Sequence, residues 1–303
     1  MDVVGLGASS VDYVYILPAA PAAGGASAKL RISSHFVSCG GQVANAMAAC
    51  AAFGLRAGFL GPIGSDANAA RVRDELVSRG VDVTSVIVRE ADNQFAVILV
   101  DERNGERIVL WERDRRLLLR AGEIDPALFG DARVLHVDDV DEEASIAAAG
   151  LAVERGMRVT SDLDRVTERT AALVESVTVP VFAEHMPSAL TGEPDLGRAL
   201  RMLRRPHHEL LCVTLGAEGA IALHGDRLVH SPAFAVDAVD TTGAGDVFRA
   251  GLIYAMLEGQ STDETLRFAN AAAAMSCTKL GAMTAVPSLE EVRALIQRQP
   301  QSR

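Results

Sequence analysis

The sequence has little of what marks membrane proteins and nucleic-acid-binding proteins. Its apolar runs all fall short of the roughly 18–20 residues that a membrane-spanning helix needs. Its 29 Lys and Arg residues are outnumbered by 40 Asp and Glu residues, and the net charge of −11 would repel a polyanionic duplex. The densest basic runs, Arg113–Arg116 and Arg198–Arg205, are interrupted by acidic or apolar residues. We therefore expect neither a nucleic-acid partner nor a membrane partner.

Cysteine and several catalytic motifs are also scarce or missing. The four cysteines lie in apolar surroundings without CxxC spacing, which favours reduced thiols in a cytoplasmic protein. There is no GxxxxGK[ST] phosphate loop, no HExxH zinc motif and no GxSxG nucleophile motif. Gly5-Leu6-Gly7 follows a predicted strand but lacks the third glycine of a dinucleotide-binding GxGxxG. These absences argue against the best-known nucleotide, zinc and hydrolase sites.

What is present is a regular alternation of short apolar runs and helix-period segments. Continuous apolar runs are typical of strands buried on both faces, and connections of this length favour parallel neighbours. The expected strands are Val3–Gly7, Ala57–Gly61, Val134–Val137, Arg158–Asp162, Val179–Ala183 and Leu210–Thr214, followed by a hairpin of Ala220–His224 and Arg227–His230 and a strand-like Phe234–Val239. The expected helices are Gln42–Phe53, Ala67–Arg79, Glu142–Arg155, Thr167–Glu175, Leu196–Arg204, Ala244–Glu258, Asp263–Thr278 and Leu289–Arg298, the last two capped by Thr262 and Ser288. The pattern predicts a single α/β domain over residues 1–303, with a mostly parallel sheet covered by helices on both faces.

Two regions depart from this alternation. Val11–Ile16, Lys29–Ile32, Phe95–Val100 and Ile108–Trp111 are β-rich, and the last two flank a polar turn that contains Asn104-Gly105. No helix separates the members of either pair. We expect a small antiparallel sheet, formed by about residues 11–38 and 93–112, that protrudes as a lid beside a cleft.

The segment Asp240–Asp246 carries the clearest chemical signal. Gly243, Ala244 and Gly245 open a helix, where backbone N–H groups lack intrahelical acceptors and the positive end of the helix dipole favours an anion. Asp246 falls in the first turn, where we expect the dipole to keep it ionised beside the bound anion. The alternative is a tight turn followed by an ordinary capping carboxylate.

The surrounding sequence resembles a known family. Asp240–Asp246, with Phe248 and Gly251, is similar to the C-terminal motif of the ribokinase-like (PfkB-type) carbohydrate kinases. Gly40-Gly41-Gln42-Val43-Ala44-Asn45 is similar to their GGxxxN element, and the resemblance extends through Gly61–Asp66, Thr214–Ala220 and Phe268–Pro287. It implies the ribokinase-like fold and an ATP-dependent kinase that phosphorylates a sugar hydroxyl, with Asp246 as base and Gly243–Gly245 as anion hole.

The resemblance also assigns substrate residues. It places Asp12, Gly40, Gly41 and Asn45 on the sugar, with Ser10 where several relatives carry Asn and Asp138 near a substrate hydroxyl. Glycine lets backbone amides approach a polyol closely, while Asp and Asn supply acceptors and donors for neighbouring hydroxyls. Without the family, Asp12 would be a turn residue and Asn45 a helix cap.

Nucleotide and metal positions follow in the same way. The loop Thr214–Ala220, with Gly216 and Gly219, is similar to the family's phosphate-side loop. Asn270 corresponds to a position lining the adenine pocket; without the family it would be interpreted as a solvent-facing polar residue of a helix. The resemblance implies ATP and Mg²⁺, and a monovalent cation such as K⁺ at Asp240 and the carbonyl of Thr242 with carbonyls near Gly281. The NxxE motif of many relatives is replaced by Ala183-Glu184-His185-Met186, leaving Glu184 to hold Mg²⁺ through water. Ketohexokinases and sulfofructose kinases also lack the full motif, and Asn104-Gly105-Glu106-Arg107 resembles that subset.

Two other functions are kept open by the sequence. A nucleoside kinase of the same fold would need an aromatic residue to stack on the base, and aromatic residues make up only 4% of the chain. The candidates in the lid are Tyr13, Tyr15, Phe36, Phe95 and Trp111. The other alternative is a non-catalytic sugar-binding regulator, which the altered NxxE segment favours. The exposed edge of a lid sheet also suits pairing into a homodimer.

Overall fold

A main sheet of eight strands forms the centre of the molecule. The computed structural model describes residues 1–25, 29–103 and 106–300. The strands β1 (Val3–Leu6), β4 (Ala57–Leu60), β9 (Val134–Asp138) and β10 (Arg158–Asp162) are all parallel, in the order β10-β9-β1-β4. β11 (Val181–Ala183), β12 (Leu211–Thr214), β13 (Ala220–His224) and β14 (Arg227–Ser231) continue the sheet, because Thr160–Val179 and Leu163–Phe182 bridges join β10 to β11. The last two strands are antiparallel, as the predicted hairpin requires.

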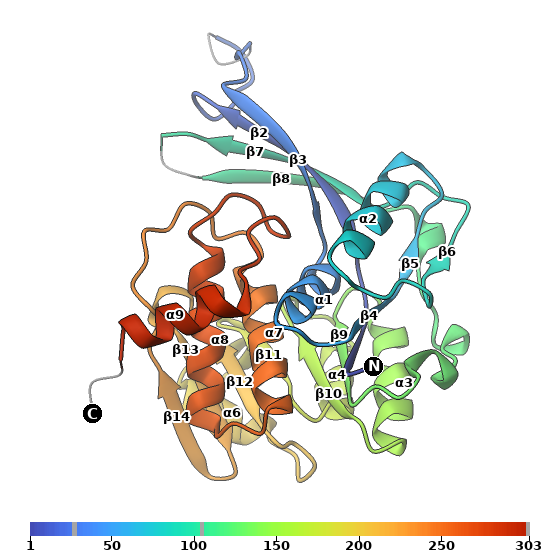
Figure 1. The fold of residues 1–303 in the computed structure, drawn as a ribbon, viewed down its shortest axis with the longest axis vertical. Helices are drawn as coiled ribbons and strands as arrows, with labels where there is room; N and C mark the ends of the chain where they lie inside the picture. Colours follow the sequence, from blue (N-terminus) through green and yellow to red (C-terminus); the bar gives the residue numbers. More distant parts are fainter. Residues whose placement is uncertain (26–28, 104–105, 301–303) are drawn as a thin grey trace.

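Helices cover both faces of this sheet, as the alternation predicts (Figure 1). They are α1 (Gln42–Ala52), α2 (Ala67–Ser78), α3 (Glu142–Glu154), α4 (Thr170–Ser176), α5 (Met186–Thr191), α6 (Leu196–Leu203), α7 (Ala244–Leu257), α8 (Thr262–Ser276) and α9 (Leu289–Arg298). Successive strand residues point to opposite faces, so Val3 joins the core with α1, α7 and α8, whereas Val4 joins the core with α3 and α4. The fold is therefore ribokinase-like α/β, with two apolar cores separated by the sheet.

A second sheet protrudes from one end of the body (Figure 1). It consists of β2 (Ser10–Leu17), β3 (Ser34–Gly40), β7 (Phe95–Asp101) and β8 (Arg107–Glu112) in the order β3-β2-β7-β8. The pairs β2–β3 and β7–β8 are antiparallel, but β2 and β7 run parallel, so the expected antiparallel sheet is in fact mixed. We call this sheet the lid. The turn residues Asn104 and Gly105 lie outside the described residues.

Three local predictions are wrong, each for a local reason. Lys29–Ile32 is not a strand, because β3 pairs with β2 from Ser34 opposite Ile16 onward and the earlier residues extend past the end of β2. Phe234–Val239 is also irregular rather than a strand. Helix α8 is capped by Ser261, not Thr262, because Glu264 three residues later completes a capping box with Ser261. Ser288 caps α9 as predicted.

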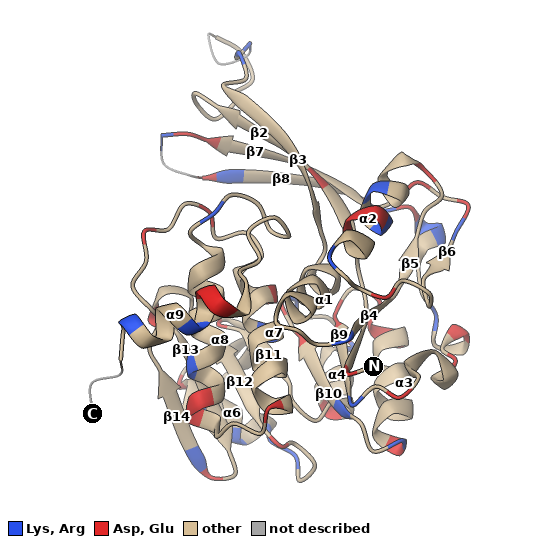
Figure 2. Ribbon diagram, viewed as in Figure 1, with Lys and Arg blue, Asp and Glu red and all other residues tan. Residues whose placement is uncertain are grey.

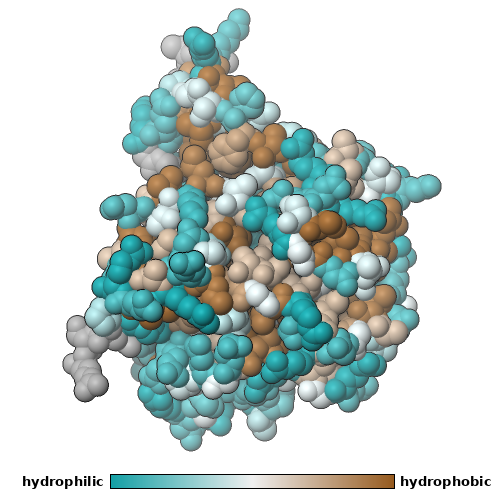
Figure 3. Space-filling model, viewed as in Figure 1, coloured by the Kyte–Doolittle hydropathy of each residue, from teal (hydrophilic) through white to brown (hydrophobic). Residues whose placement is uncertain are grey.

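Charged residues of both signs are interspersed along the helices and loops of the body (Figure 2). Among the described residues, no helix is long and apolar enough to cross a bilayer. Apolar side chains are visible on the protruding lid (Figure 3), where β8 exposes Ile108, Val109, Leu110 and Trp111.

Candidate active site

The N-terminus of α7 lies between the lid and helix α8. Gly243 is its N-cap with φ +76°, a conformation that L side chains rarely adopt, and a Cβ there would lie 2.9 Å from the Cβ of Ala282. Asp240 organises the preceding turn: its Oδ1 accepts from the Thr242 amide and its Oδ2 from the Gly281 amide, both at 2.9 Å. The Ala244 amide closes the turn onto the Thr241 carbonyl at 3.2 Å. The first amides of α7 are thus held in a rigid turn.

Asp246 occupies the first turn of α7 and contacts the N-terminal motif. Its Oδ2 accepts a hydrogen bond from Asn45 Nδ2 at 2.7 Å, although the two residues are 201 positions apart in sequence. The sequence analysis expects the helix dipole to keep Asp246 ionised. Instead, burial and the neighbouring Asp162 carboxyl group raise the pKa of Asp246 well above its ordinary value. The Asn45 hydrogen bond and Arg249 act in the opposite direction but do not offset this rise.

Asp162 and Arg249 were not singled out from the sequence. Asp162 ends β10 and Arg249 lies one turn after Asp246 in α7, and Arg249 Nη2 lies 2.6 Å from Asp162 Oδ1 in a buried ion pair. A signal for the pair was present, since Arg249 is a single charged residue within the apolar run Val247–Leu257. A buried charge needs a counter-charge, so this residue predicts a buried acid without saying which one.

The first of two cavities lies between the lid and the α7 turn. Its volume is about 440 Å³, and its wall includes Asp12, Ser38 and Arg107 from the lid and Asp240 and Thr242 from the turn. Arg107 Nη1 donates to Thr242 Oγ1 at 2.7 Å, so the lid touches the turn directly. We call this space the lid cavity.

Of the predicted substrate residues, Asp12 lines the lid cavity, and Ser10 and Gly40 lie next to Asp12. Ser10 pairs with Gly40 in the β2–β3 ladder, and Ser10 Oγ donates to Asp12 Oδ1 at 3.0 Å. A Cβ on Gly40 would come within 2.4 Å of Asp12 Oδ2, so glycine gives the carboxylate its space. Burial raises the pKa of Asp12 despite the hydrogen bond from Ser10. Gly41 has φ +102° and caps α1, the helix that carries Asn45.

Asp138, another predicted substrate residue, lies in the interior. It is fully buried, and its carboxylate accepts from the amides of Ala8 at 2.7 Å and Val140 at 3.0 Å. Burial raises its pKa to about 7 against these two hydrogen bonds. A Cβ on Gly7 would overlap its Oδ2. Asp138 therefore holds the strand ends together from the interior and does not face either cavity.

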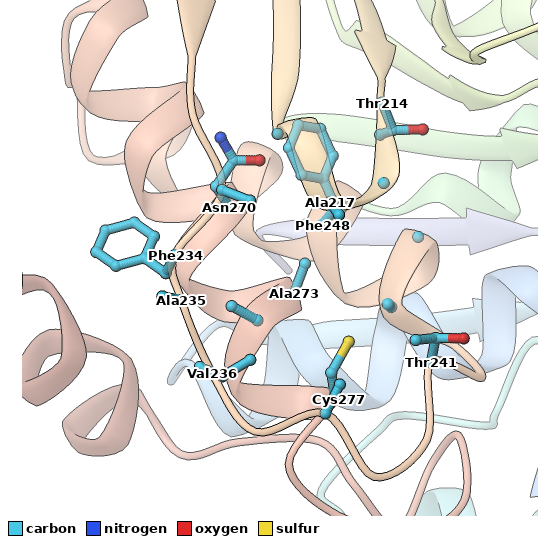
Figure 4. A pocket seen from close by; sticks show the side chains of 17 residues that line it. Thr214, Ala217, Phe234, Ala235, Val236, Thr241, Phe248, Asn270, Ala273 and Cys277 are labelled. Atoms are coloured by element: carbon cyan, nitrogen blue, oxygen red, sulfur yellow. The ribbon is translucent and has the colours of Figure 1, made fainter.

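The second cavity lies beside helix α8 (Figure 4) and has a volume of about 430 Å³. We call it the α8 cavity. Its wall includes the predicted nucleotide residues Thr214, Gly216, Gly219 and Asn270. Asn270 is only 5% exposed and its Nδ2 donates to the Ser231 carbonyl at 2.8 Å, so the alternative of a solvent-facing helix residue is wrong. The rest of the wall is small or apolar: Ala217, Ala233, Phe234, Ala235, Val236, Ala238, Phe248, Ala273, Ala274 and Cys277, with Thr241, Ala244 and Gly245 at one end.

The predicted metal residues are placed separately. Glu184 is exposed in the turn that follows β11. Asp240 is half-buried; burial alone would raise its pKa, but hydrogen bonds from Thr242 and Gly281 outweigh burial and lower it. Within residues 1–25, 29–103 and 106–300, no three His, Cys, Asp or Glu side chains cluster as a metal site.

The fold and site together define a class. Two cavities meet at a helix N-terminus suited to an anion, and a carboxyl group follows in the first turn. This arrangement suits an α/β enzyme that transfers an anionic group between two small molecules.

Comparison with known proteins identifies the family. The family model of the pfkB family carbohydrate kinases matches residues 11–289, and the chain belongs to this family. It is a phosphotransferase with an alcohol group as acceptor. The chain is 27% identical to a ribokinase of Haemophilus influenzae, over 96% of this chain and 97% of that protein. It is 30% identical to an ATP-dependent ribose-1-phosphate kinase of Halopiger xanaduensis, over 89% and 90%. The solved structure of Arabidopsis thaliana ribokinase complexed with ribose and ATP has the same fold, with a TM-score of 0.84, 23% identity and 98% of both chains covered.

Proposed function

We propose that the protein is an ATP-dependent kinase for a hydroxyl group of a sugar or sugar derivative, with the sugar in the lid cavity and ATP in the α8 cavity. One observation carries the proposal. Thr241 lines both cavities, Thr242 lines the lid cavity, and Ala244 and Gly245 line the α8 cavity. The turn that opens α7 is therefore the place where an acceptor in one cavity meets a phosphoryl donor in the other.

The polar groups around the lid cavity suit a polyol. Asp12, held by Ser10, offers carboxylate oxygens, and Gly40 leaves space for the Asp12 carboxylate. Asn45 is buried, its amide nitrogen is used by Asp246, and its Oδ1 has no hydrogen-bond partner among the described residues. A buried acceptor without a donor costs free energy, so a substrate hydroxyl is the natural partner for Asn45 Oδ1.

The α8 cavity suits a nucleotide. Adenine is flat and mostly apolar on its faces, which matches the Ala, Val and Phe side chains of the wall, and Asn270 and Thr214 supply polar edges. Gly219 has φ +96°, and a Cβ there would lie 2.1 Å from the Ser231 carbonyl oxygen. Only glycine therefore lets the loop Thr214–Ala220 pass this close to the wall of the cavity.

The catalytic roles follow from the geometry of the α7 turn. When bound, ATP with Mg²⁺ supplies the γ-phosphoryl group and spreads its negative charge. Asp246 accepts the proton of the sugar hydroxyl as the bond from its oxygen to the γ-phosphorus forms and the bond from that phosphorus to ADP breaks, so that ADP leaves. The amides of Gly243 and Gly245 donate to the oxygens on which charge develops, the Ala244 amide joins them when it is released from the Thr241 carbonyl, and the lid excludes water.

The proposed metal sites use few side chains of this chain. The phosphates themselves provide Mg²⁺ ligands, and we assign Glu184 a role through a bound water. We place K⁺ at Asp240, with the carbonyl of Thr242 and carbonyls near Gly281. Both Asp240 oxygens already accept one amide hydrogen bond, and each keeps a lone pair for a cation. Activity that is unchanged when K⁺ replaces a large organic cation would remove this ion from the proposal.

The aromatic residues favour a sugar over a nucleoside as acceptor. Of the five aromatic candidates in the lid, only Phe36 lines the lid cavity. Tyr13 packs edge-on against Phe95 and donates to Asn68, Tyr15 stacks on His35, and Trp111 is 66% exposed. Ribose and ribose 1-phosphate, the substrates in the names of the two relatives, are the first acceptors to test, followed by ketohexoses, deoxygluconates and nucleosides.

The central test is Asp246→Asn. It should lower kcat on the order of 10²-fold or more, because an amide cannot accept the proton, while nucleotide binding is retained. Asp263→Asn is the matched control, since Asp263 also lies in the first turn of a helix but far from both cavities. An ADP-release assay measures turnover, and nucleotide titration measures binding. Turnover that is equal in Asp246→Asn and Asp263→Asn would overturn the assignment of the base.

The lid also supports a proposal about assembly and location. β8 is an edge strand with Ile108, Val109, Leu110 and Trp111 exposed, and pairing with a second copy would cover them. We propose a homodimer through the lid, to be checked by sedimentation of the protein and of Leu110→Lys, which should be monomeric. The four cysteines are all free thiols, which supports a cytoplasmic location.

A further inference from the structure

Asp246 lies beside a second carboxyl group that the proposed mechanism does not use. Asp162 is only 2% exposed, and its ion-pair partner Arg249 lies one turn after Asp246 in α7, which makes the two carboxyl groups close neighbours. Two buried carboxyl groups side by side do not both ionise readily, so they hold one proton between them and titrate as a pair. A base in this position takes up a proton only after the pair has released its own. The state of Asp162 therefore governs whether Asp246 can act.

Arg249 lies between this pair and the anion-binding turn. Its side chain is 5% exposed and its Nη2 is 2.6 Å from Asp162 Oδ1. A Cβ on Gly245 would lie 2.8 Å from Arg249 Nη1, so the guanidinium packs directly against the glycine of the turn. Its Nε is buried and has no hydrogen-bond partner within the described part of the chain. An arginine buried at this cost, with its donors incompletely used, is not explained by stability alone.

We propose that Arg249 is a positioning residue that neutralises one of two neighbouring carboxylates, Asp162, and so allows Asp246 to give up the shared proton and act as the base. This inference rests on the proposed role of Asp246. With Arg249 present, loss of the shared proton leaves one net negative charge on the three side chains. Without it, the same step would place two unneutralised carboxylates side by side.

Asp138, the register partner of Asp162 on β9, has its pKa raised by burial to about 7, so it titrates near neutral pH in the wild type and in every variant alike. His136 on β9 is fully buried, and burial followed by the charge of Arg249 lowers its pKa to about 3. Cys212 on β12 has its pKa raised to about 12 by burial. Asp139 and Asp164 lie beyond Asp162, and their charges oppose its ionisation. Because Asp138 is unchanged in all the variants, a shift of the acidic limb between variants reports the Asp162–Asp246 pair.

The measurement is the pH dependence of kcat/KM for the wild type, Arg249→Lys and Arg249→Met. The wild type should lose activity as pH falls and the pair takes up its proton. In Arg249→Met this acidic limb should move up by about one pH unit, giving about 10-fold lower kcat/KM below the limb and near-equal activity well above it. Arg249→Lys keeps the charge and should restore the limb to within a few tenths of a unit of wild type. The proposal would be overturned if the acidic limb of kcat/KM had the same midpoint in the wild type and Arg249→Met. It would also be overturned if the midpoint shifted equally in Arg249→Lys and Arg249→Met.

A second variant covers poor folding of Arg249→Met. The double variant Asp162→Asn/Arg249→Met removes both buried charges together, so no unpaired charge is left inside. Because the second carboxylate is gone, its acidic limb should lie at or below that of the wild type. A limb that rises in the double variant would contradict the model of a carboxylate pair. Asp246→Asn separates the two claims: if it loses turnover and the Arg249 variants do not shift the limb, the base assignment stands and only the role of Arg249 fails.

Discussion

Replacing Gly41 by alanine should damage both stability and sugar binding. Gly41 has φ +102°, where an L residue costs about 1–2 kcal/mol. The new Cβ would lie 2.5 Å from Ser9 Cα and 2.6 Å from the Ala8 carbonyl oxygen. Both atoms are backbone, so relief requires movement of the β1–β2 connection, at a further cost of about 1–3 kcal/mol. The substitution also stiffens the unfolded chain, which offsets about 0.4–1 kcal/mol. The expected net loss is about 1–4.6 kcal/mol, with a central value of about 3 kcal/mol.

Gly54→Ala is the matched control at the other end of helix α1. Gly54 has φ +92°, but nothing lies within 4 Å of a Cβ there. Only the backbone term applies, so the loss should be about 1 kcal/mol after the unfolded-state offset. Urea unfolding measures both values. Since the moved backbone leads directly to Ser10 and Asp12, KM for the sugar should rise in Gly41→Ala and stay at its wild-type value in Gly54→Ala. Equal destabilisation by the two substitutions would refute the argument from overlap.

Three further substitutions test other parts of the structure. Gly219→Ala should raise KM for ATP several-fold and leave KM for the sugar unchanged, because its Cβ would meet the Ser231 carbonyl; steady-state kinetics with each substrate varied will show which one changes. Asn45→Ala removes the 2.7 Å hydrogen bond to Asp246 and should cost about 1.5–3 kcal/mol in urea unfolding as well as sugar affinity. His136→Gln should flatten the pH dependence of stability. In the wild type the folded-state pKa of His136 is about 3, below the ordinary 6.5, so the unfolded chain takes up this proton first as pH falls. The stability of the wild type should therefore fall by up to about 1.4 kcal/mol per pH unit below pH 6.5. Unfolding curves of both proteins at pH 7 and pH 5 that differ by a constant amount would contradict the last prediction.

The body of the fold could be predicted from sequence because its signals are local. A strand such as Leu210–Thr214 is a short apolar run that follows the charged Glu209, and β12 spans Leu211–Thr214 in the structure. The lid was predicted less well. Its hairpins follow from nearby turn residues, but the parallel pairing of β2 with β7 joins segments about 80 residues apart and has no local signal. The same limit misplaced β3, whose bounds are set by where β2 ends.

The residues of the candidate site also differ in whether a local sequence signal identifies them. Asp246, Gly243 and Asn45 belong to motifs that can be read directly, and the structure brings the two motifs together through one hydrogen bond. Asp162 and Arg249 belong to no motif, and only the packing of β10 against α7 pairs them. A single arginine in an apolar helix shows that a buried acid exists, but it does not show that the acid lies beside the base.

The charge state of Asp246 shows why such contacts decide chemistry. A helix N-terminus stabilises a carboxylate by about 0.3–1 kcal/mol, which is less than one pKa unit. Burial and a neighbouring carboxyl group can each shift a pKa by several units in the other direction. The effect of the helix dipole can be predicted from sequence because it is local. Burial and the neighbouring carboxyl group cannot, because they come from residues distant in the chain. The direction of the Asp246 pKa shift is therefore set by the fold. An enzyme that uses such a base at neutral pH needs a compensating positive charge within the same buried cluster. Arg249 meets that requirement, since it is paired with the carboxyl group that opposes ionisation of Asp246 and packs against the turn where the phosphoryl group would be held.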